Sequence, residues 1–474
     1  MSDEEKVLTD EIAEQFIAYE DSVDIGEFTN IEDDAVESLS KYEGDLNLSG
    51  LTELSDAAAE SLSEYAGFLY LYGLTELSDG TAESLSKHKG WLDLDGLTSL
   101  SDAAAESLSK HEGDLKLRGL TTLSDGPGHI ALAERLSKDE GDLYLSGLTE
   151  LSDAAAESLS KHEGSLRLGG LTELSDVAAE SLGGKHDGFL SLNGLTALSD
   201  AAAESLSKHE GGQNLSGLTS LSDAAAASLS KHRGDINLQG LTSLSDGPGH
   251  IALAERLSKH EGDLYLPVLS SLSDAAAESL SKHEGDLYLR VLTSLSDAAA
   301  EKLSKHEGDL YLDGLTSLSD AAAESLSKHE GGLYLRVLTS LSDAAAASLS
   351  KHRGDINLQG LTSLSDGPGH IALAERLSKD EGDLYLSGLT ELSDAAAESL
   401  SKHEGDLYLR GLTTLSDAAA ELLSTHKGWI GLNSLTSLSD AAATSLSKCQ
   451  DVSIDLENFL TSAAQILRDA GHGE

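Results

Sequence analysis

Basic residues are scarce in this chain of 474 residues: 32 Lys and Arg stand against 83 Asp and Glu, and the formal net charge is −51. Nucleic-acid binding requires a basic surface that displaces counterions from phosphates, and no run of Lys and Arg supplies one. The same charge is repelled by anionic membranes. We therefore expect neither nucleic acid nor membrane as a partner. Either the solubility of a long thin molecule or a high-salt habitat explains the acidity.

Cysteine and long hydrophobic stretches are also lacking. Cys449 is the single cysteine, so an intramolecular disulfide framework is excluded and a reducing compartment is expected. No stretch approaches the roughly 18 consecutive apolar residues of a membrane-spanning helix. The N-terminal segment leads into no apolar core of a secretory signal. Together these absences predict a cytoplasmic protein.

What the chain has in abundance is internal repetition. The block GLTxLSDAAAESLSKHEGDLYL returns along nearly the whole sequence, and the leucine before Ser-Asp recurs mostly every 23 residues, as from Leu54 to Leu77. Between Leu8 and Leu438 there are 19 such units, which leave no room for a separate globular domain. Three units are 28 residues long and contain GPGHIALAER.

Each unit combines a short strand with a short helix. Leu287, Tyr288 and Leu289 alternate apolar and polar residues as a strand does. The following SDAAAESLSKHEG predicts a helix with Ser or Asp at its N-cap and Gly after its end. In the long units, Pro predicts a longer helix start with Pro near the first turn. Because so short a helix is marginal alone, stacking of neighbouring units must bury the leucines.

The pattern L-x-L-x-G-L-x-x-L-S-D-x-x-x-x-x-L resembles the leucine-rich repeat family. Within that family it is similar to the cysteine-containing, ribonuclease-inhibitor-like branch, with Leu in place of Cys. Leu51, Leu97 and Leu148 occupy the family's Asn or Cys position, so its polar ladder to the loop backbone is expected to be missing. The resemblance implies an α/β leucine-rich repeat solenoid, a curved horseshoe or superhelix, with a parallel β-sheet on the concave face and short helices on the convex face.

The ends of such an array need a polar cover over the exposed leucines. We predict an N-terminal capping repeat, the repeat array and a C-terminal capping segment at residues 1–30, 31–450 and 451–474. Near the C-terminus, Ile454, Leu456 and Phe459 match a last strand in a shifted register. A closing amphipathic helix is expected to follow it.

Tyr and Arg recur at the positions that face solvent on the concave side of the resembled fold. Both residue types are enriched at interaction hot spots. The residues we expect to bind a partner are Tyr265, Tyr288, Arg290, Tyr311, Tyr334, Arg336, Tyr385, Tyr408 and Arg410. Tyr also has a high strand propensity and stacks within sheets, so a purely structural row stays open as the alternative.

Large apolar residues replace the usual Asp on the same face, at Phe68, Trp91, Phe189 and Trp429. If exposed, they indicate a partner or self-association. The alternative is that they pack over one flank of the array.

A histidine near the end of most helices raises the question of metal binding. Neighbouring histidines are expected about 8 to 10 Å apart, too far for two of them to share one zinc at about 2 Å. Interaction with the helix dipole is the simpler interpretation. The Gly-Pro-Gly-His sequences at His129, His250 and His370 lack the Lys and spacing of a P-loop. No nucleophile and base stand apart from the repeated Ser, Asp and His. We expect no metal, no cofactor and no enzymatic activity.

Two functions follow from these expectations. The first is a non-catalytic repeat scaffold for protein–protein interaction through the concave face, with an unknown protein partner. The second is a structural, self-assembling protein, which the near-identity of the units favours. Calcium binding by the acidic surface has less support, because the Asp and Glu residues form no fixed ligand loop.

Overall fold

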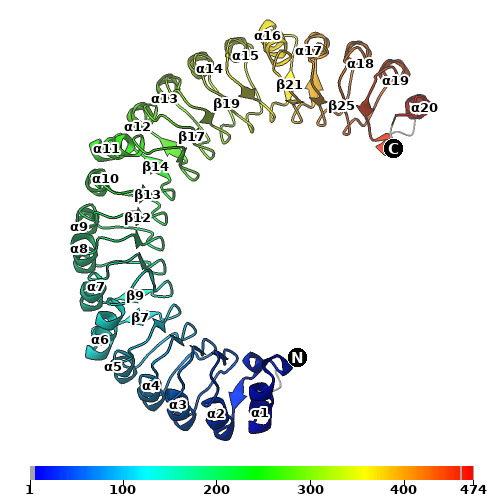
Figure 1. Ribbon diagram of the computed structural model, residues 1–474. Coiled ribbons are helices and arrows are strands. Elements are labelled where there is room, and N and C mark those ends of the chain that lie inside the picture. Colours follow the sequence, from blue (N-terminus) through cyan, green and yellow to red (C-terminus); the bar gives the residue numbers. More distant parts are fainter. Residues whose placement is uncertain (1–5, 459–461, 473–474) are drawn as a thin grey trace. The chain divides into compact units, whose positions relative to one another are not determined.

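The computed structural model describes residues 6–458 and 462–472. The chain divides into two compact parts, residues 1–238 and residues 239–474, which we call the N-terminal half and the C-terminal half. In each half, short parallel strands and short helices alternate, and the helices form one row while the strands form another (Figure 1). The fold is an α/β solenoid of the leucine-rich repeat type, as predicted.

The N-terminal half contains two long sheets of parallel strands, β3-β4-β5-β6 and β8-β10-β11-β12-β13, and the pairs β1-β2 and β7-β9. Its helices are α1 (Asp10–Ala18), α2 (Asp33–Leu39), α3 (Asp56–Ser63), α4 (Asp79–Leu85), α5 (Asp102–Leu108), α6 (Pro127–Leu136), α7 (Asp153–Leu159), α8 (Asp176–Lys185), α9 (Asp200–Leu206) and α10 (Asp223–Leu229). Its strands are β1 (Val7–Leu8), β2 (Asn30–Ile31), β3 (Leu46–Asn47), β4 (Leu69–Tyr70), β5 (Leu92–Asp93), β6 (Leu115–Lys116), β7 (Thr122–Leu123), β8 (Leu143–Tyr144), β9 (Glu150–Leu151), β10 (Leu166–Arg167), β11 (Leu190–Ser191), β12 (Gln213–Asn214) and β13 (Ile236–Asn237).

The C-terminal half has the long sheets β15-β17-β18-β19-β20 and β22-β24-β25-β26, and the pairs β14-β16 and β21-β23. Its helices are α11 (Pro248–Leu257), α12 (Asp274–Leu280), α13 (Asp297–Leu303), α14 (Asp320–Leu326), α15 (Asp343–Leu349), α16 (Pro368–Leu377), α17 (Asp394–Leu400), α18 (Asp417–Leu423), α19 (Asp440–Leu446) and α20 (Ser462–Asp469). Its strands are β14 (Ser243–Leu244), β15 (Leu264–Tyr265), β16 (Ser271–Leu272), β17 (Leu287–Tyr288), β18 (Leu310–Tyr311), β19 (Leu333–Tyr334), β20 (Ile356–Asn357), β21 (Ser363–Leu364), β22 (Leu384–Tyr385), β23 (Glu391–Leu392), β24 (Leu407–Tyr408), β25 (Ile430–Gly431) and β26 (Val452–Ser453).

The core between the two rows consists of Leu and Ala. A typical unit buries three leucines from the strand and the turn after it, and two alanines and one leucine from the helix: Leu287, Leu289, Leu292, Ala299, Ala300 and Leu303. These six side chains are at most 1% exposed. Stacking therefore removes from water the apolar surface that a lone unit would expose.

In most ordinary units, the Ser-Asp dipeptide links a helix to the helix before it. The Ser296 side chain caps α13 by accepting the backbone N–H of Ala299 at 2.9 Å. Its hydroxyl also donates to the carboxylate of Asp274, at the start of α12. This pattern recurs along the helix row and confirms the predicted Ser cap.

Threonine forms a polar ladder to the loop backbone, next to the leucine position where the resembled family has Asn or Cys. The expectation that this ladder is missing is wrong. The backbone N–H and the hydroxyl of Thr121 donate to the carbonyl of Thr98, at 3.0 and 2.8 Å. Thr362 bonds to Thr339 in the same way, at 2.9 Å for both donors. Because Thr carries its own hydroxyl, the adjacent leucine is free to be wholly apolar.

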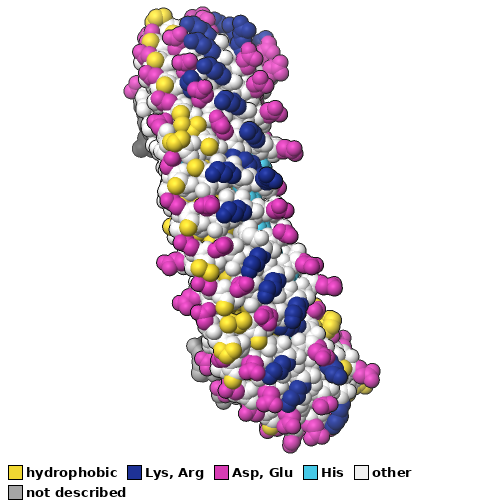
Figure 2. Space-filling view, turned by 90° about the vertical axis from the view of Figure 1, so that its left-hand side faces the viewer, with side chains coloured by type: hydrophobic (Ala, Val, Ile, Leu, Met, Phe, Trp, Pro, Cys, Tyr) yellow, Lys and Arg dark blue, Asp and Glu magenta, His cyan; other side chains and the backbone are white. Residues whose placement is uncertain are grey.

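On the helix side of the molecule, Lys and Arg side chains follow a row flanked by Asp and Glu (Figure 2). Pairs such as Lys110 with Glu106, at 3.3 Å, bridge one helical turn. Both partners are more than half exposed, so each pair contributes little to stability.

The long units have longer helices with Pro in the first turn, as predicted. Pro127 lies in the first turn of α6, which has ten residues. Gly126 offers no side chain at the N-cap, and Asp102 of the preceding unit accepts the N–H groups of Gly128 and His129, at 2.9 and 3.3 Å. Each long unit of the array also separates two long sheets, as between β6 and β8 and between β20 and β22.

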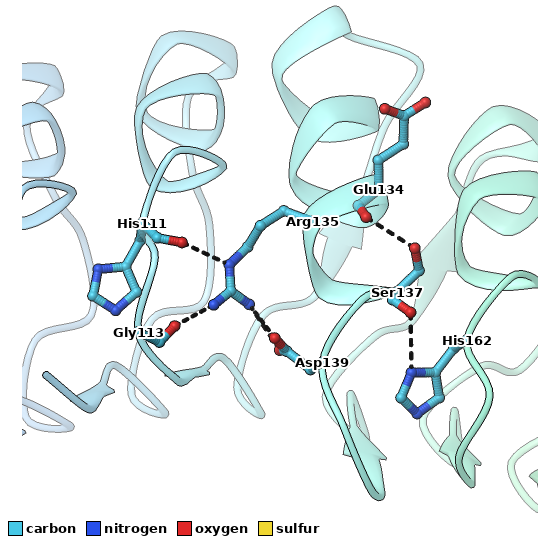
Figure 3. Close-up of polar contacts among 7 residues, drawn as sticks. All are labelled: His111, Gly113, Glu134, Arg135, Ser137, Asp139 and His162. Atoms are coloured by element: carbon cyan, nitrogen blue, oxygen red, sulfur yellow. Dashed lines mark hydrogen bonds and ion pairs between the residues drawn. The ribbon is translucent and has the colours of Figure 1, made fainter. Parts of the chain in front are cut away.

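In two of these long units, a pair of Arg and Asp takes the place of the recurrent histidine. Asp139 occupies the position of the recurrent His, and Arg135 donates to both of its carboxylate oxygens at 2.7 Å (Figure 3). The same guanidinium donates to the carbonyl of His111 at 3.0 Å and to that of Gly113. Arg376 and Asp380 repeat the arrangement. The guanidinium thus bonds the loop carbonyls that a His ring contacts in ordinary units.

The last strand of the array is β26, at Val452–Ser453. The predicted strand at Ile454 and Leu456 is therefore wrong, because Val452 pairs with Ile430 and places Ile454 and Leu456 beyond the strand, where both are buried. Phe459 lies outside the described residues. The closing helix α20 is confirmed, and it buries Ala463, Ala464 and Leu467. Among the helices in the described part of the chain, none combines the length and apolar character needed to cross a bilayer.

We predict that Arg135→Ala destabilises the N-terminal half of the chain by roughly 2 to 3 kcal/mol. The substitution removes the donors to two loop carbonyls and leaves Asp139, whose side chain is 24% exposed, without its counter-charge. Urea unfolding followed by circular dichroism measures the change. Lys110→Ala, which removes an exposed ion pair, is the matched control and should change stability by less than about 0.5 kcal/mol. Equal effects of the two substitutions would contradict the role given to Arg135.

Candidate functional site

Four of the predicted tyrosines form one continuous stack on adjacent strands. Tyr265, Tyr288, Tyr311 and Tyr334 are paired in register on β15, β17, β18 and β19. Their ring centroids are 4.3, 4.1 and 4.2 Å apart, with interplanar angles of 14°, 9° and 3°. We call these four residues the tyrosine stack. Since neighbouring rings cover each other's faces, the stack presents mainly ring edges and hydroxyl groups to solvent.

A row of aspartates runs along one side of the tyrosine stack. The Asp263 carboxylate accepts the backbone N–H of Asp286 at 3.2 Å, and Asp286 accepts that of Asp309 at 2.9 Å. Asp309 in turn accepts the N–H of Gly332 at 2.7 Å. These bonds hold each carboxylate beside the start of the next strand.

The hydroxyl groups of the stack are held by hydrogen bonds. Tyr265 donates to Asp263 at 3.3 Å and Tyr334 to Asp309 at 3.4 Å. Hydrogen bonding with Tyr288, and then burial, raise the pKa of Tyr265 to about 12. The hydroxyl edge is therefore neutral and fixed in position at physiological pH.

Two arginines lie over the other side of the stack. The Arg290 guanidinium is 4.9 Å from the ring centroid of Tyr288 and 5.4 Å from that of Tyr311. Arg336 is 5.8 Å from the Tyr334 centroid. Both guanidinium groups stay about half exposed, so their N–H groups can reach a ligand.

Asp313, on the strand side between these arginines, was not among the predicted site residues. Its carboxylate lies 3.8 Å from Arg290 and 3.6 Å from Arg336, and the side chain is only 13% exposed. The sequence carried a signal for it, because YLDGL at this unit separates two units with YLRVL. Asp313 holds both cations in place and neutralises one of them.

The other three predicted residues form a second group on the sheet β22-β24-β25-β26. The rings of Tyr385 and Tyr408 stack at 4.3 Å, and Trp429 lies 4.9 Å from Tyr408 at an angle of 54°. The Arg410 guanidinium is 5.2 Å from the Tyr408 centroid and 5.7 Å from that of Trp429. The nine predicted residues thus form two separate groups, both within residues 239–474.

The aromatic residues of the N-terminal half pack in smaller clusters. Phe68 and Trp91 are 5.2 Å apart and tilted, and the Arg167 guanidinium lies 4.8 Å from the Phe189 ring. Phe68 is still 42% exposed, which is a large apolar surface to leave in water.

The recurrent histidines are buried, with His260 as an exposed exception, which the sequence did not indicate. Consecutive rings, as at His306 and His329, stack nearly in parallel with centroids 6.2 Å apart. The expected separation of 8 to 10 Å is wrong, because it assumed helix spacing, whereas these rings lie between the helix end and the next strand. The helix-dipole interpretation also fails, since a favourable dipole interaction requires a charged imidazolium.

Burial lowers the pKa of several of these histidines, whereas the backbone carbonyls that their ring nitrogens contact act in the opposite direction. His162 contacts the carbonyl of Gly141 through Nε2 at 2.9 Å, and His186 contacts that of His162 through Nδ1 at 2.9 Å. Burial, and then the charge of Arg135 and His88, lower the pKa of His111 to about 4. Burial, with neighbouring histidines, lowers the pKa of His329 to about 4 as well. In the described residues, no three His, Cys, Asp or Glu side chains are placed to hold a metal ion.

Comparisons with known proteins add little to this geometry. No protein-family model and no curated protein sequence matches the chain. Among solved structures, it is similar to a leucine-rich repeat protein of Leptospira interrogans, with 16% identity over 93% of this chain and 98% of that chain and a TM-score of 0.33. It is also similar to the Toll–Spatzle complex of Drosophila, with 14% identity over 85% of this chain and 60% of that chain and a TM-score of 0.38. An internalin of Listeria monocytogenes shares 15% identity over 68% of this chain and 82% of that chain, with a TM-score of 0.28. Likenesses this distant carry no information on function.

We predict that stability falls as pH decreases from about 6.5 toward 4. The buried histidines have a lower pKa in the folded chain than in the unfolded chain, so protons bind preferentially to the unfolded state. Their contribution is complete above the unfolded pKa and is lost as pH falls toward the folded value. Urea midpoints measured between pH 7 and 5.5 avoid most carboxylate titration. A midpoint that rises on acidification would show that relief of the −51 net charge outweighs the histidines.

Zinc or nickel should not raise the melting temperature. Rings stacked in parallel cannot both direct an in-plane nitrogen at one ion about 2 Å away. Thermal scans with increasing metal measure the effect. A rise in melting temperature that saturates at low micromolar metal would reveal a site through linkage.

Proposed function

We propose that this protein is a non-catalytic repeat scaffold that binds a protein partner through the strand side of residues 239–474. The tyrosine stack, with Arg290 and Arg336, is the proposed docking surface. The observation that carries the proposal is four aromatic rings fixed in one stack with two guanidinium groups laid over them.

Preorganisation is the physical advantage of this surface. The rings and hydroxyl groups are already held, so binding a partner costs little side-chain entropy. Exposed valines at one position of the repeat add apolar contact area; Val268, Val291 and Val337 are 41%, 39% and 45% exposed, and the last two directly follow the arginines in the chain. Aromatic, cationic and apolar groups side by side are typical of protein-binding hot spots.

The charge and the single thiol support the rest of the proposal. A net charge of −51 favours a protein partner over nucleic acid or an anionic membrane. Burial raises the pKa of the Cys449 thiol to about 11, so this thiol is inert, and a lone inert cysteine suits a cytoplasmic protein. Most units have Leu-Ser-Asp where the ribonuclease-inhibitor-like branch has Ile-Thr-Asp, and this likeness supports a relation to that branch.

Self-assembly is the second candidate. The exposed row of Val268, Val291 and Val337 favours it, because an apolar row on nearly identical units can be covered by a second copy. Light scattering over a concentration series distinguishes the two functions: a mass that stays at 49.5 kDa opposes self-assembly.

Replacing Tyr288 and Tyr311 together by Ala should weaken partner binding by about 2 kcal/mol or more while leaving the fold intact. Both rings lie outside the buried leucine core, although the remaining Tyr265 and Tyr334 each lose one stacking neighbour. The measurement is a titration with a partner captured from native extract, alongside a melting curve. The control is Tyr70→Ala, which removes a half-buried tyrosine of β4 in the N-terminal half of the chain. Unchanged affinity with a lowered melting temperature would show that the stack is only structural.

A further inference from the structure

We propose that Arg410, laid on Tyr408 and Trp429, binds a carboxylate side chain of an acidic peptide segment whose flanking apolar residues contact the aromatic rings. This site lies on β24 and β25 and does not depend on the tyrosine stack. It assigns a ligand chemistry to one position of the strand side.

The other exposed arginines of the same column pair with a carboxylate from a neighbouring unit. Arg118 lies 3.4 Å from Asp95, and Arg290 and Arg336 share Asp313 at 3.8 and 3.6 Å. The repeat itself therefore shows that an arginine here is within reach of a carboxylate one strand away. Carboxylate is the anion this position is built to meet.

Arg410 has no such partner. The strands paired with β24 place Ser387 and Asn433 beside Arg410 in this column, whereas Asp95 stands beside Arg118, and Asp313 beside Arg290 and Arg336. Within the described residues, no ion pair forms at Arg410, although the chain carries 83 acidic residues. Among the described residues, Arg410 is therefore the one arginine of this column without an ion pair, and its exposed guanidinium is available to a ligand.

Nearby carboxylates are engaged elsewhere. Asp406 accepts the backbone N–H of Trp429 at 2.9 Å, and Asp455 accepts that of Glu457 at 3.1 Å. Asn433 donates its amide to Ser453 at 2.9 Å. These bonds hold the surroundings of Arg410 in place without neutralising it.

The aromatic platform sets the orientation of the cation. Its contacts with the Tyr408 and Trp429 rings leave the in-plane N–H groups of the guanidinium available. Those groups match a carboxylate in a bidentate pair. Tyr385, which is 45% exposed, continues the platform on the next strand and offers apolar surface to residues beside the acidic one.

The probe is a blocked peptide with the sequence Gly-Leu-Glu-Phe-Glu-Leu-Gly, titrated into the full chain at 0.15 M salt, where the general repulsion between acidic surfaces is screened beyond about 8 Å. The readouts are the NMR signals of the Arg410 Nε–H and the Trp429 indole N–H. We expect a saturable shift of both signals. Arg410→Gln, or Gln in place of both Glu in the peptide, should weaken binding roughly tenfold or more.

The repeat offers a matched test. Asn433→Asp supplies the carboxylate that Asp313 provides to Arg290 and Arg336, and this internal partner should weaken peptide binding as strongly as Arg410→Gln does. Arg336→Gln should leave binding unchanged, and unchanged circular dichroism excludes unfolding for every variant. The proposal is overturned if Asn433→Asp binds the peptide like the wild type, if Arg336→Gln abolishes binding, or if inorganic phosphate displaces the peptide at equal concentration.

Discussion

In-register parallel pairing of two-residue strands is the constraint on which the rest of this structure depends. Leu287 pairs with Leu310 and Tyr288 with Tyr311, so each position of a unit lies beside the same position of the next. A column in the aligned repeats therefore becomes a row of touching side chains. Whatever chemistry a position carries is repeated at strand spacing, and it must be compatible with a copy of itself.

Several columns meet this demand with groups that both donate and accept. The Ser cap donates to an Asp one unit back, and the Thr hydroxyl donates to a Thr carbonyl one unit back. Tyrosine and histidine meet it by stacking, because flat neutral rings tolerate identical neighbours. A charged imidazolium would repel its copies, and burial together with neighbouring charges lowers the pKa of histidines such as His111 and His329.

Functional individuality arises where a column changes its residue. Asp139 breaks the histidine row and requires Arg135 as its partner. Asp313 interrupts the arginine column and fixes two cations over the tyrosine stack. Asn433, at the equivalent place in a later unit, leaves Arg410 without an internal carboxylate. One uncharged residue in place of Asp thus separates a structural ion pair from a candidate binding site.

The sequence by itself determined the solenoid, because leucine spacing, Ser caps and Pro at the long helices act within one unit and can be read locally. It also identified the tyrosine and arginine columns, since period two indicates which strand positions avoid the core. Only the tertiary structure decided that most of the recurrent histidines are buried, that Thr forms the polar ladder, and that Arg135 bonds the carbonyls that a histidine contacts elsewhere. Those outcomes depend on how far a side chain lies from the strand row and on which atom of the preceding unit it meets. Contact between units is a property of stacking, and a single unit of sequence does not contain it.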